Sequence, residues 1–208
     1  MRVLWLTLAI VLVDQITKVI VATQMYLGQS IPVIGDVLKW TFTENPGMAF
    51  GVRLGNGDLG KMALSVFSVI ATGAIFAYLR HVREAPAGYR LSLALILGGA
   101  LGNVIDRVFY GTIFGECGPG VQSARLLHGC VVDFFHLDIG RFEAFGRSIQ
   151  VFPIGNIADL AIIAGVVGVL LSQKAFQRYI HEREMAPSIA TASQTVEAHE
   201  DSAPPPAA

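Results

Sequence analysis

The stretch "GNIADLAIIAGVVGVLLS", residues 155–172, decides the fold class, because it is long and apolar enough to cross a lipid bilayer as a helix. A bilayer core of about 30 Å needs roughly 20 apolar residues in helical conformation. One carboxylate, Asp159, lies in the first predicted turn of this helix. Because an ionisable side chain is costly inside a membrane, it marks a candidate functional residue. The stretch therefore predicts a membrane protein and a first residue of its site.

The composition of the whole chain supports the same interpretation. Of its 208 residues, 53% are hydrophobic and only 15% are charged, whereas soluble domains carry about 25% charged residues. Besides residues 155–173, the windows 3–22, 62–80 and 91–110 have the length and apolar character of membrane spans. The net charge is −1, and no basic run suggests a nucleic-acid partner. We therefore expect an all-α membrane protein with four transmembrane helices.

The long connection at residues 23–61 contains "SIPVIGDVLKWTFTEN", residues 30–45, in which apolar and polar residues partly alternate. Alternation with a period of two is typical of half-buried strands. An even number of spans puts both termini on one side of the membrane, and the loop 81–90 on that side is basic. The positive-inside rule makes this side cytoplasmic. We therefore expect a small extracytoplasmic β-rich platform on the opposite side.

The chain changes character after residue 184. Residues 1–184 hold the predicted spans, and we expect them to form one membrane-embedded domain. Residues 185–208 are rich in Ala, Ser, Thr and Pro and have no apolar period, so they cannot bury a core. We expect this tail to be disordered and cytoplasmic.

Two of the predicted spans carry charged groups of opposite sign. In the first span, Asp14 and Lys18 are four residues apart on one helix face. They either neutralise each other for insertion, or Asp14 braces a functional site. In the third span, Asn103, Asp106 and Arg107 also share a face. Asp106 and Arg107 either neutralise each other beside a packing seam, or the Arg107 guanidinium holds the carbonyls of a bound peptide.

Two carboxylates lie at the same predicted edge of the membrane. Asp133 stands between apolar neighbours in "GCVVDFFH", residues 129–136, and Asp159 follows Asn156 by three residues on one helix face. Burial raises the pKa of a carboxyl group, and a second carboxylate nearby raises it further. Two such acids sharing one proton can activate water and polarise a peptide carbonyl, as in aspartic peptidases. Alternatively, each acid anchors a helix end independently.

Polar residues outside the spans leave further alternatives. Asn45 in "TENPGMAFG", residues 43–51, belongs either to a tight turn or to the site as a hydrogen-bond partner. His128, Cys130, Asp133 and His136 lie close together in the sequence. Their spacing fits no common zinc pattern. We therefore expect no metal and no cofactor.

Five segments, taken in chain order, resemble those of the lipoprotein signal peptidase (signal peptidase II) family. The members of this family are bacterial intramembrane aspartic peptidases. The five segments spread over most of residues 3–173, and their order makes the resemblance far more specific than any single motif. The segments are "DQITK" (14–18), "TENPGMAFG" (43–51), "GGALGNVIDR" (98–107), "VVDFFH" (131–136) and "NIAD" (156–159).

The resemblance implies an aspartic endopeptidase that removes the signal peptide from diacylglyceryl-modified prolipoproteins, cleaving before the lipidated cysteine with water activated by two acids. It also implies an inner-membrane location, a site towards the outer leaflet, prolipoprotein and lipid partners, and inhibition by globomycin-type compounds. The residues that match the family's site are Asp133 and Asp159 as the catalytic pair, Asn45, Asn103, Arg107 and Asn156 as substrate-binding residues, and Asp14, Lys18 and Asp106 as supporting residues.

Two other functions are compatible with parts of the sequence. A small ion-coupled transporter would also place carboxylates in its spans, but Asp106, Asp133 and Asp159 gather towards one face instead of following a path across the bilayer. A structural membrane scaffold would need no paired acids. The connection that holds Cys117 and Cys130 is longer than is usual in the family, and the sequence leaves a disulfide between them open.

Overall fold

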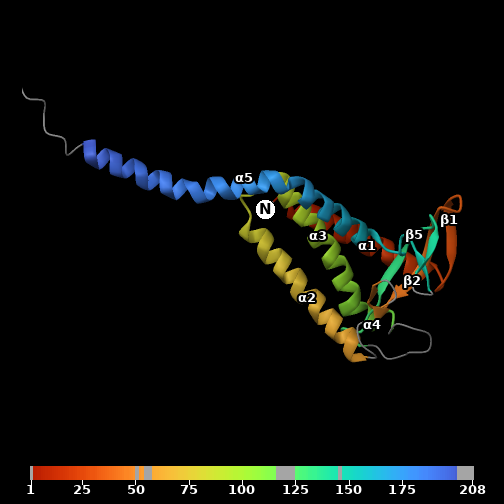
Figure 1. Ribbon diagram of the computed structural model, residues 1–208. Helices are drawn as coiled ribbons and strands as arrows, with labels where there is room; N and C mark the ends of the chain where they lie inside the picture. The colour runs from red at the N-terminus through yellow and green to blue at the C-terminus, as the bar shows by residue number, and fades with distance from the viewer. Residues whose placement is uncertain (1, 50–51, 54–57, 116–124, 145–146, 201–208) are drawn as a thin grey trace, which may run out of the picture.

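The computed structural model describes residues 2–49, 52–53, 58–115, 125–144 and 147–200. Its long helices are α1 (Leu4–Gln24), α2 (Asp58–His81), α3 (Ala87–Ile105) and α5 (Ile157–Glu200). α3 continues without a break into a π-helix, η1 (Asp106–Tyr110), and a single turn, α4 (Gly111–Ile113). Figure 1 shows the helices as a bundle with a small sheet at one end.

Four helical segments in the described part of the chain are long and apolar enough to cross a membrane. Each ends beyond the window expected from hydropathy, most clearly the last, because an existing helix readily propagates into polar residues at its ends. The prediction of four transmembrane helices is thereby confirmed. The segments are Leu4–Gln24, Leu59–His81, Ala87–Ile113 and Ile157–Met185.

α3 is the central helix, since it contacts α1, α2 and α5. Small residues allow these close approaches. A methyl group added at Gly98 would meet Ile10 of α1, and one at Gly99 would meet the backbone carbonyl of Ala158 in α5. On the outside of α5, Leu171 is 81% exposed, as expected for a side chain that faces lipid. The bundle is therefore packed along α3 and apolar on its outer surface.

The sheet lies at one end of this bundle and is antiparallel, in the order β1 (Ser30–Ile34), β2 (Leu38–Asn45), β5 (Val131–Leu137). Thr43 of β2 pairs with Asp133 of β5. The first two strands confirm the expectation for residues 30–45, whereas a strand at Asp133 was not expected from the sequence. Two short hairpins complete the strands: β3 (Met48–Ala49) with β4 (Val52–Arg53), and β6 (Arg141–Ala144) with β7 (Arg147–Gln150).

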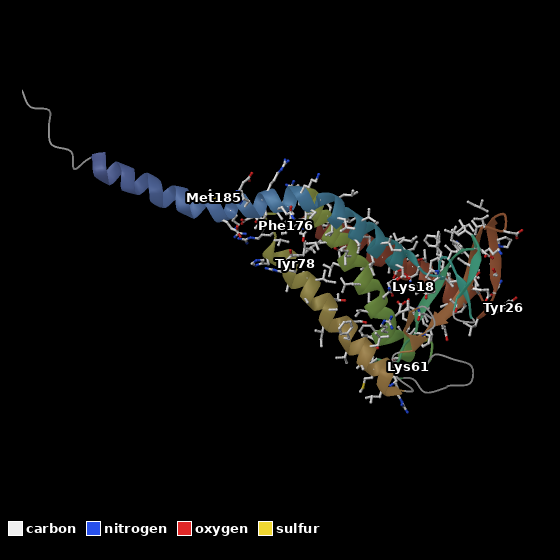
Figure 2. All side chains as sticks on the ribbon, in the orientation of Figure 1. Lys18, Tyr26, Lys61, Tyr78, Phe176 and Met185 are labelled. Atoms are coloured by element: carbon white, nitrogen blue, oxygen red, sulfur yellow. The ribbon has the colours of Figure 1, made fainter. Side chains whose placement is uncertain are left out.

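Two apolar cores hold the molecule at its two ends. One face of the sheet packs on the end of α1 and on η1, through a core that includes Val21, Phe42 and Val132. The second core lies around the α2–α3 connection and includes Leu79 and Leu97. Figure 2 shows the two ends well separated, with Lys18 and Tyr26 towards the sheet and Tyr78 and Phe176 far from it. The sheet is thereby fixed on the bundle by its own core.

The C-terminal tail differs from the prediction. α5 continues as a helix to Glu200, whereas the sequence predicts disorder from residue 185. Nucleation is the unfavourable step in helix formation, so an existing helix is extended at little cost, and Ala, Gln and Glu favour helix. Figure 1 shows this last part of α5 leaving the bundle. Residues 201–208 lie outside the described residues, and the division of the chain at residue 184 stays a prediction.

Candidate active site

Asp133 is held in the middle of β5 with its side chain almost completely buried, at 2% exposure for the residue. Two amide groups donate hydrogen bonds to its carboxylate. The Asn45 side chain, at the end of β2, donates to Oδ2 at 3.1 Å. The Asn156 side chain donates to Oδ1 at 2.7 Å. Asn45 therefore belongs to the site as a hydrogen-bond partner and also accepts a bond from the Gly47 backbone in its turn, at 2.9 Å.

Asp159 lies in the first turn of α5, as the sequence predicts. Asn156 and Asp159 cap this helix reciprocally. The Asp159 backbone N–H donates to the Asn156 side-chain oxygen at 3.0 Å, and the Asn156 backbone N–H donates to the Asp159 carboxylate at 3.2 Å. Asn103 of α3 donates a third bond, from Nδ2 to Asp159 Oδ1 at 2.9 Å. The free N–H groups of a helix N-terminus also favour a negative charge there.

The structure brings the two carboxylates to one place, because Asn156 contacts both. Its side-chain nitrogen bonds Asp133, while its backbone nitrogen and side-chain oxygen bond Asp159. The same side-chain nitrogen also donates to Asn103 Oδ1, at 3.2 Å. An asparagine that serves as the N-cap of α5 thus also ties α5 to the sheet.

The environment of Asp133 favours its protonated form. Burial, and then the nearby negative charge of Asp159, raise the pKa of Asp133 to about 7. Hydrogen bonds from Asn45 and Asn156 and the charge of Lys18 lower the pKa but do not offset these two effects. One carboxyl group that keeps a proton near neutral pH, next to a second carboxylate, is the arrangement that dyad chemistry requires.

Close to the two acids is a group of three fully buried charged residues, which we call the ion triad: Asp14, Lys18 and Asp106. The Lys18 ammonium is 2.8 Å from a carboxylate oxygen of Asp14 and 2.8 Å from one of Asp106. Asp14 and Lys18 thus form the ion pair considered from the sequence. Asp106 pairs with Lys18, which is distant in the chain, and not with its neighbour Arg107, the neutralising pair that was one of the two interpretations of the sequence.

Arg107 is only partly buried and lies in η1, where the helix widens locally. π-helical turns are frequent at functional sites. Its positive charge acts on the carboxylates of Asp133 and Asp159. Gly47, in the turn after β2, has a φ of +100° and lies against Arg107 and Leu64. The positive φ and the lack of space both require glycine at this point of the site.

Gln15, which contacts the ion triad, and Tyr110, which contacts Gln15, were not singled out from the sequence. Gln15 donates from Nε2 to Asp106 at 2.9 Å and to Asp14 at 3.2 Å. Tyr110 donates its hydroxyl proton to Gln15 Oε1 at 3.1 Å. The only available signal was a glutamine within an apolar span, next to an aspartate. Such a residue is unremarkable without knowledge of what packs on it.

The histidines considered as metal ligands bond elsewhere. The His136 ring contacts the Thr41 hydroxyl at 2.9 Å, and the His128 ring contacts the Leu126 carbonyl at 2.8 Å. Within the ranges that the structure describes, no group of three or more His, Cys, Asp or Glu side chains is arranged to hold a metal ion. Cys130 is buried and disulfide-bonded, and Cys117 lies outside the described residues.

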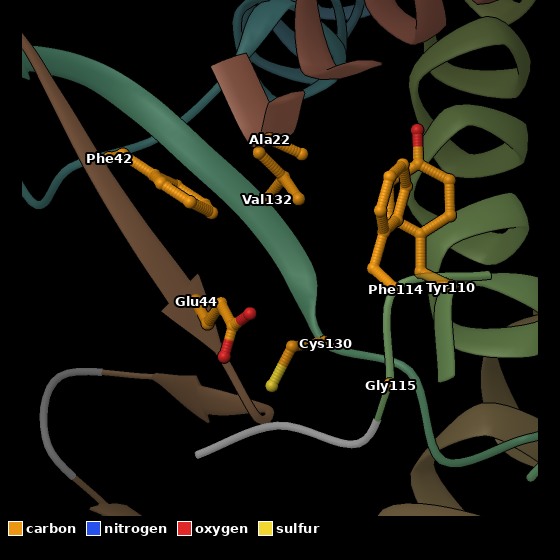
Figure 3. Close-up of a pocket in the computed structure, with 8 residues that line it drawn as sticks. All are labelled: Ala22, Phe42, Glu44, Tyr110, Phe114, Gly115, Cys130 and Val132. Carbon is orange, nitrogen blue, oxygen red and sulfur yellow. The ribbon is translucent and has the colours of Figure 1, made fainter. Parts of the chain in front are cut away.

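A pocket beside the sheet is lined in part by residues of its core (Figure 3), and neither Asp133 nor Asp159 is among the lining residues. Phe42 and Val132 extend from the strands into its wall. Tyr110 and Phe114 close it from the end of the third span, with their rings 4.9 Å apart edge to face. Its full lining is Ala22, Phe42, Glu44, Tyr110, Phe114, Gly115, Cys130 and Val132.

The fold and the site together define a multi-pass membrane enzyme. Two solved structures, each described as a bacterial membrane enzyme, share this fold, with TM-scores of 0.57 and 0.59 and 29% identity. They cover 83% of this chain, which in turn covers 87% and 92% of theirs.

The family model for signal peptidase (SPase) II matches residues 6–175. A lipoprotein signal peptidase of Porphyromonas gingivalis is 36% identical over 80% of both chains. One of Amoebophilus asiaticus is 34% identical over 82% of this chain and 76% of its own. One of Chlorobium phaeobacteroides is 36% identical over 79% of this chain and 91% of its own. The chain therefore belongs to the signal peptidase II family and is a peptidase.

Proposed function

We propose that this chain is an aspartic endopeptidase that removes the signal peptide from diacylglyceryl-modified bacterial prolipoproteins, cleaving before the lipidated cysteine. The relatives are named as lipoprotein signal peptidases, which supports the substrate class. The observation that carries the aspartic mechanism is the shared contact of Asn156, whose atoms bond both the Asp133 and the Asp159 carboxylates.

The geometry supports different roles for the two acids. Asp133 is the more buried and holds the proton, since its pKa is raised to about 7 by burial and by the charge of Asp159. Asp159, at the N-terminus of α5 and with donors from Asn103 and Asn156, is the ionised member. In the proposed mechanism the two acids therefore share one proton.

In the proposed reaction, Asp159 takes a proton from water while the water oxygen bonds to the scissile carbonyl carbon. Asp133 gives its proton to the carbonyl oxygen, which forms a neutral tetrahedral intermediate. Asp159 then passes its proton to the leaving nitrogen as the C–N bond breaks. Asp133 regains its proton from the hydroxyl group that becomes the new carboxyl carbonyl. Both acids return to their starting states.

Substrate binding uses groups on the partly exposed side of the dyad. Arg107 is partly buried beside the two acids and can hold the peptide carbonyls of the substrate. Strand β1, which pairs with β2, is exposed along its whole length. This exposure suits contact with lipid or with the acyl chains of the substrate. Its apolar side chains, together with those of its turn, are Ile31, Val33, Ile34 and Val37. A globomycin-type inhibitor would occupy the same site.

The location that we propose is the bacterial inner membrane, with both termini cytoplasmic and the dyad towards the outer leaflet. Arg80 and His81 end α2, Arg83 follows in the α2–α3 connection, and Arg90 lies in the first turn of α3. This basic connection lies at the end of the bundle opposite the sheet (Figure 1). Basic residues favour the cytoplasmic side, which supports an outward-facing dyad.

The test uses the purified full chain and a synthetic peptide whose cysteine carries diacylglyceryl. We expect cleavage immediately before that cysteine without added metal, and much slower cleavage of the unmodified peptide. Asp133→Asn and Asp159→Asn should abolish cleavage while the protein still accumulates in the membrane.

Asp138→Asn is the matched control, because Asp138 follows the same strand but forms a partly exposed ion pair with Lys39 at 3.0 Å. Exposed pairs contribute little to stability, so this variant should keep its activity. Full cleavage by both dyad variants would refute the aspartic mechanism. Equal cleavage of modified and unmodified peptides would refute the substrate class.

A further inference from the structure

Each acid of the dyad is preceded in the chain by a residue whose backbone N–H is bonded to a buried carboxylate. The Val132 N–H, directly before Asp133, donates to Asp106 at 3.2 Å. The Ala158 N–H, directly before Asp159, donates to Asp14 at 2.9 Å. Two elements far apart in the sequence, β5 and α5, are thus held in the same way at equivalent points.

Lys18 joins these two attachments. Its ammonium lies 2.8 Å from both Asp14 and Asp106, and all three side chains are completely buried. An ammonium group can only donate hydrogen bonds. Its bond to Asn103 Oδ1, at 2.9 Å, therefore turns the Asn103 amide so that its nitrogen faces Asp159.

We propose that Gln15 and Tyr110 are positioning residues, which hold the ion triad of Asp14, Lys18 and Asp106 in place and through it set the separation between the two acids of the dyad. This proposal rests on the proposed function, since it concerns the rate of the same reaction. None of these residues needs to touch substrate, because the triad acts through the backbone ahead of each acid.

Gln15 and Tyr110 are well placed for this role. Gln15 Nε2 donates to the carboxylates of both Asp14 and Asp106. It therefore joins the same two carboxylates that Lys18 joins. Its amide has one productive orientation, because Tyr110 donates to its oxygen at 3.1 Å. Without the tyrosine hydroxyl the amide is free to turn, and the carboxylates would then face an oxygen instead of donors.

A looser triad changes the chemistry in a way that can be measured. The charged groups that act on Asp133 are Asp159 from α5, Lys18 from α1 and Arg107 from η1, and β2 presents the neutral Asn45. If β5 and α5 move apart, the negative charge of Asp159 acts less strongly on Asp133 and water enters. Both changes lower the pKa of Asp133, so the high-pH decline in activity should begin at a lower pH.

The experiment compares Tyr110→Phe and Gln15→Met with the wild-type full chain, using the diacylglyceryl peptide. Neither change alters the charge of the site. We expect kcat to fall about fivefold for Tyr110→Phe, the usual effect of one hydrogen bond, and more for Gln15→Met. KM should change less than twofold, and the high-pH limb of kcat should move to lower pH. A loss of folded protein alone would lower the amplitude without moving this limb.

Tyr78→Phe and Thr17→Val are the matched controls. Tyr78 bonds the Tyr89 hydroxyl in the second core, and Thr17 bonds its own helix backbone. Both should match the wild type. The proposal is overturned if Tyr110→Phe and Gln15→Met, in an enzyme that cleaves, keep both the wild-type kcat and the wild-type pH profile. A wild-type chain that does not cleave would instead refute the proposed function.

Lys18→Met is the more drastic variant, because it leaves two buried carboxylates without their cation. We expect a loss of activity of about 100-fold, the usual consequence of misplaced catalytic groups. Its pH profile is not informative, since losing the Lys18 charge raises the pKa of Asp133 while separation of the acids lowers it. The neutral variants of Gln15 and Tyr110 therefore decide the question even if this one does not fold.

Discussion

The two ends of the helical bundle differ in their buried charges. Next to the sheet, three fully buried charges are paired, with Lys18 between Asp14 and Asp106, beside the apolar core that includes Val21 and Phe42. At the far end, buried residues such as Leu97 form an apolar core, and the Tyr89 and Phe176 rings stack 3.9 Å apart. Figure 2 shows Lys18 and Phe176 at these two ends.

The difference teaches what the buried charges do. A membrane protein can be packed without buried ions, as the far end demonstrates, and each buried ion carries a desolvation penalty. The ions beside the sheet are therefore not needed to hold helices together. They bond the backbone next to each acid of the dyad, so their role is to fix positions. Changes at the sheet end should mainly alter the rate, and changes at the far end should mainly alter stability.

The largest effect expected outside the dyad itself is that of Asn156→Ala. The substitution removes donors to Asp133 and the cap of α5 at the same time. We expect kcat to fall about 100- to 1,000-fold, as for other preorganised donors at active sites. Cleavage of the diacylglyceryl peptide measures this.

Thr7→Ala is a matched change at the far end of the bundle, since Thr7 makes a buried hydrogen bond to the Ala94 carbonyl at 3.0 Å. It should leave kcat within about twofold of the wild type, because an ordinary hydrogen bond contributes about 1 kcal/mol to stability and touches no reacting group here. Equal losses in the two variants would contradict the contrast between the two ends.

The pH dependence should reveal the shared proton. Activity requires one proton on the pair, and the pKa of Asp133 is raised to about 7, first by burial and then by Asp159. An acid loses its proton as pH rises, so kcat should decline above about pH 7, by about tenfold per pH unit. Single-turnover rates from pH 5 to pH 9 would measure this decline. A rate that stays constant up to pH 9 would show that Asp133 does not hold the required proton.

The smallest effect on the rate should come from Leu97→Ala in the far core. Leu97 is 1% exposed, and removal of a buried leucine side chain typically costs about 2–5 kcal/mol of stability through the cavity left behind. The melting temperature should fall, while kcat per folded molecule changes less than about twofold. Thermal denaturation and active-site titration separate the two quantities. A large fall in kcat would show that the ends are coupled.

Local patterns in the sequence are informative wherever the structure is local. Runs of about 20 apolar residues correctly indicated four transmembrane helices, because the bilayer fixes the length of a span. Alternation correctly indicated strands in residues 30–45. Asp159 was expected in the first turn of its helix and lies there. The five ordered segments indicated the family, which the match over residues 6–175 shows.

Contacts between segments that are distant in the chain could not be predicted from the sequence. Asp133 was not expected on a strand. A neutralising pair between Asp106 and its neighbour Arg107 was one of the two interpretations of the third span, whereas Lys18 pairs with Asp106. Gln15 and Tyr110 were missed, because a polar side chain in an apolar span does not reveal which carboxylates it meets. The helix between residues 185 and 200 was missed, because composition does not report that a preceding helix can continue.

The sequence alone determined that this protein spans a membrane four times, which acids are candidates for chemistry, and which family it belongs to. Hydropathy, period and motif order are properties of contiguous residues, so they can be read along the chain. Only the tertiary structure decided that Asn156 joins the two acids and that Lys18 joins the carboxylates behind them. The hydrogen bonds that fix the site connect α1, η1, β5 and α5. Their partners are chosen by packing around the glycines of α3 and not by spacing in the chain.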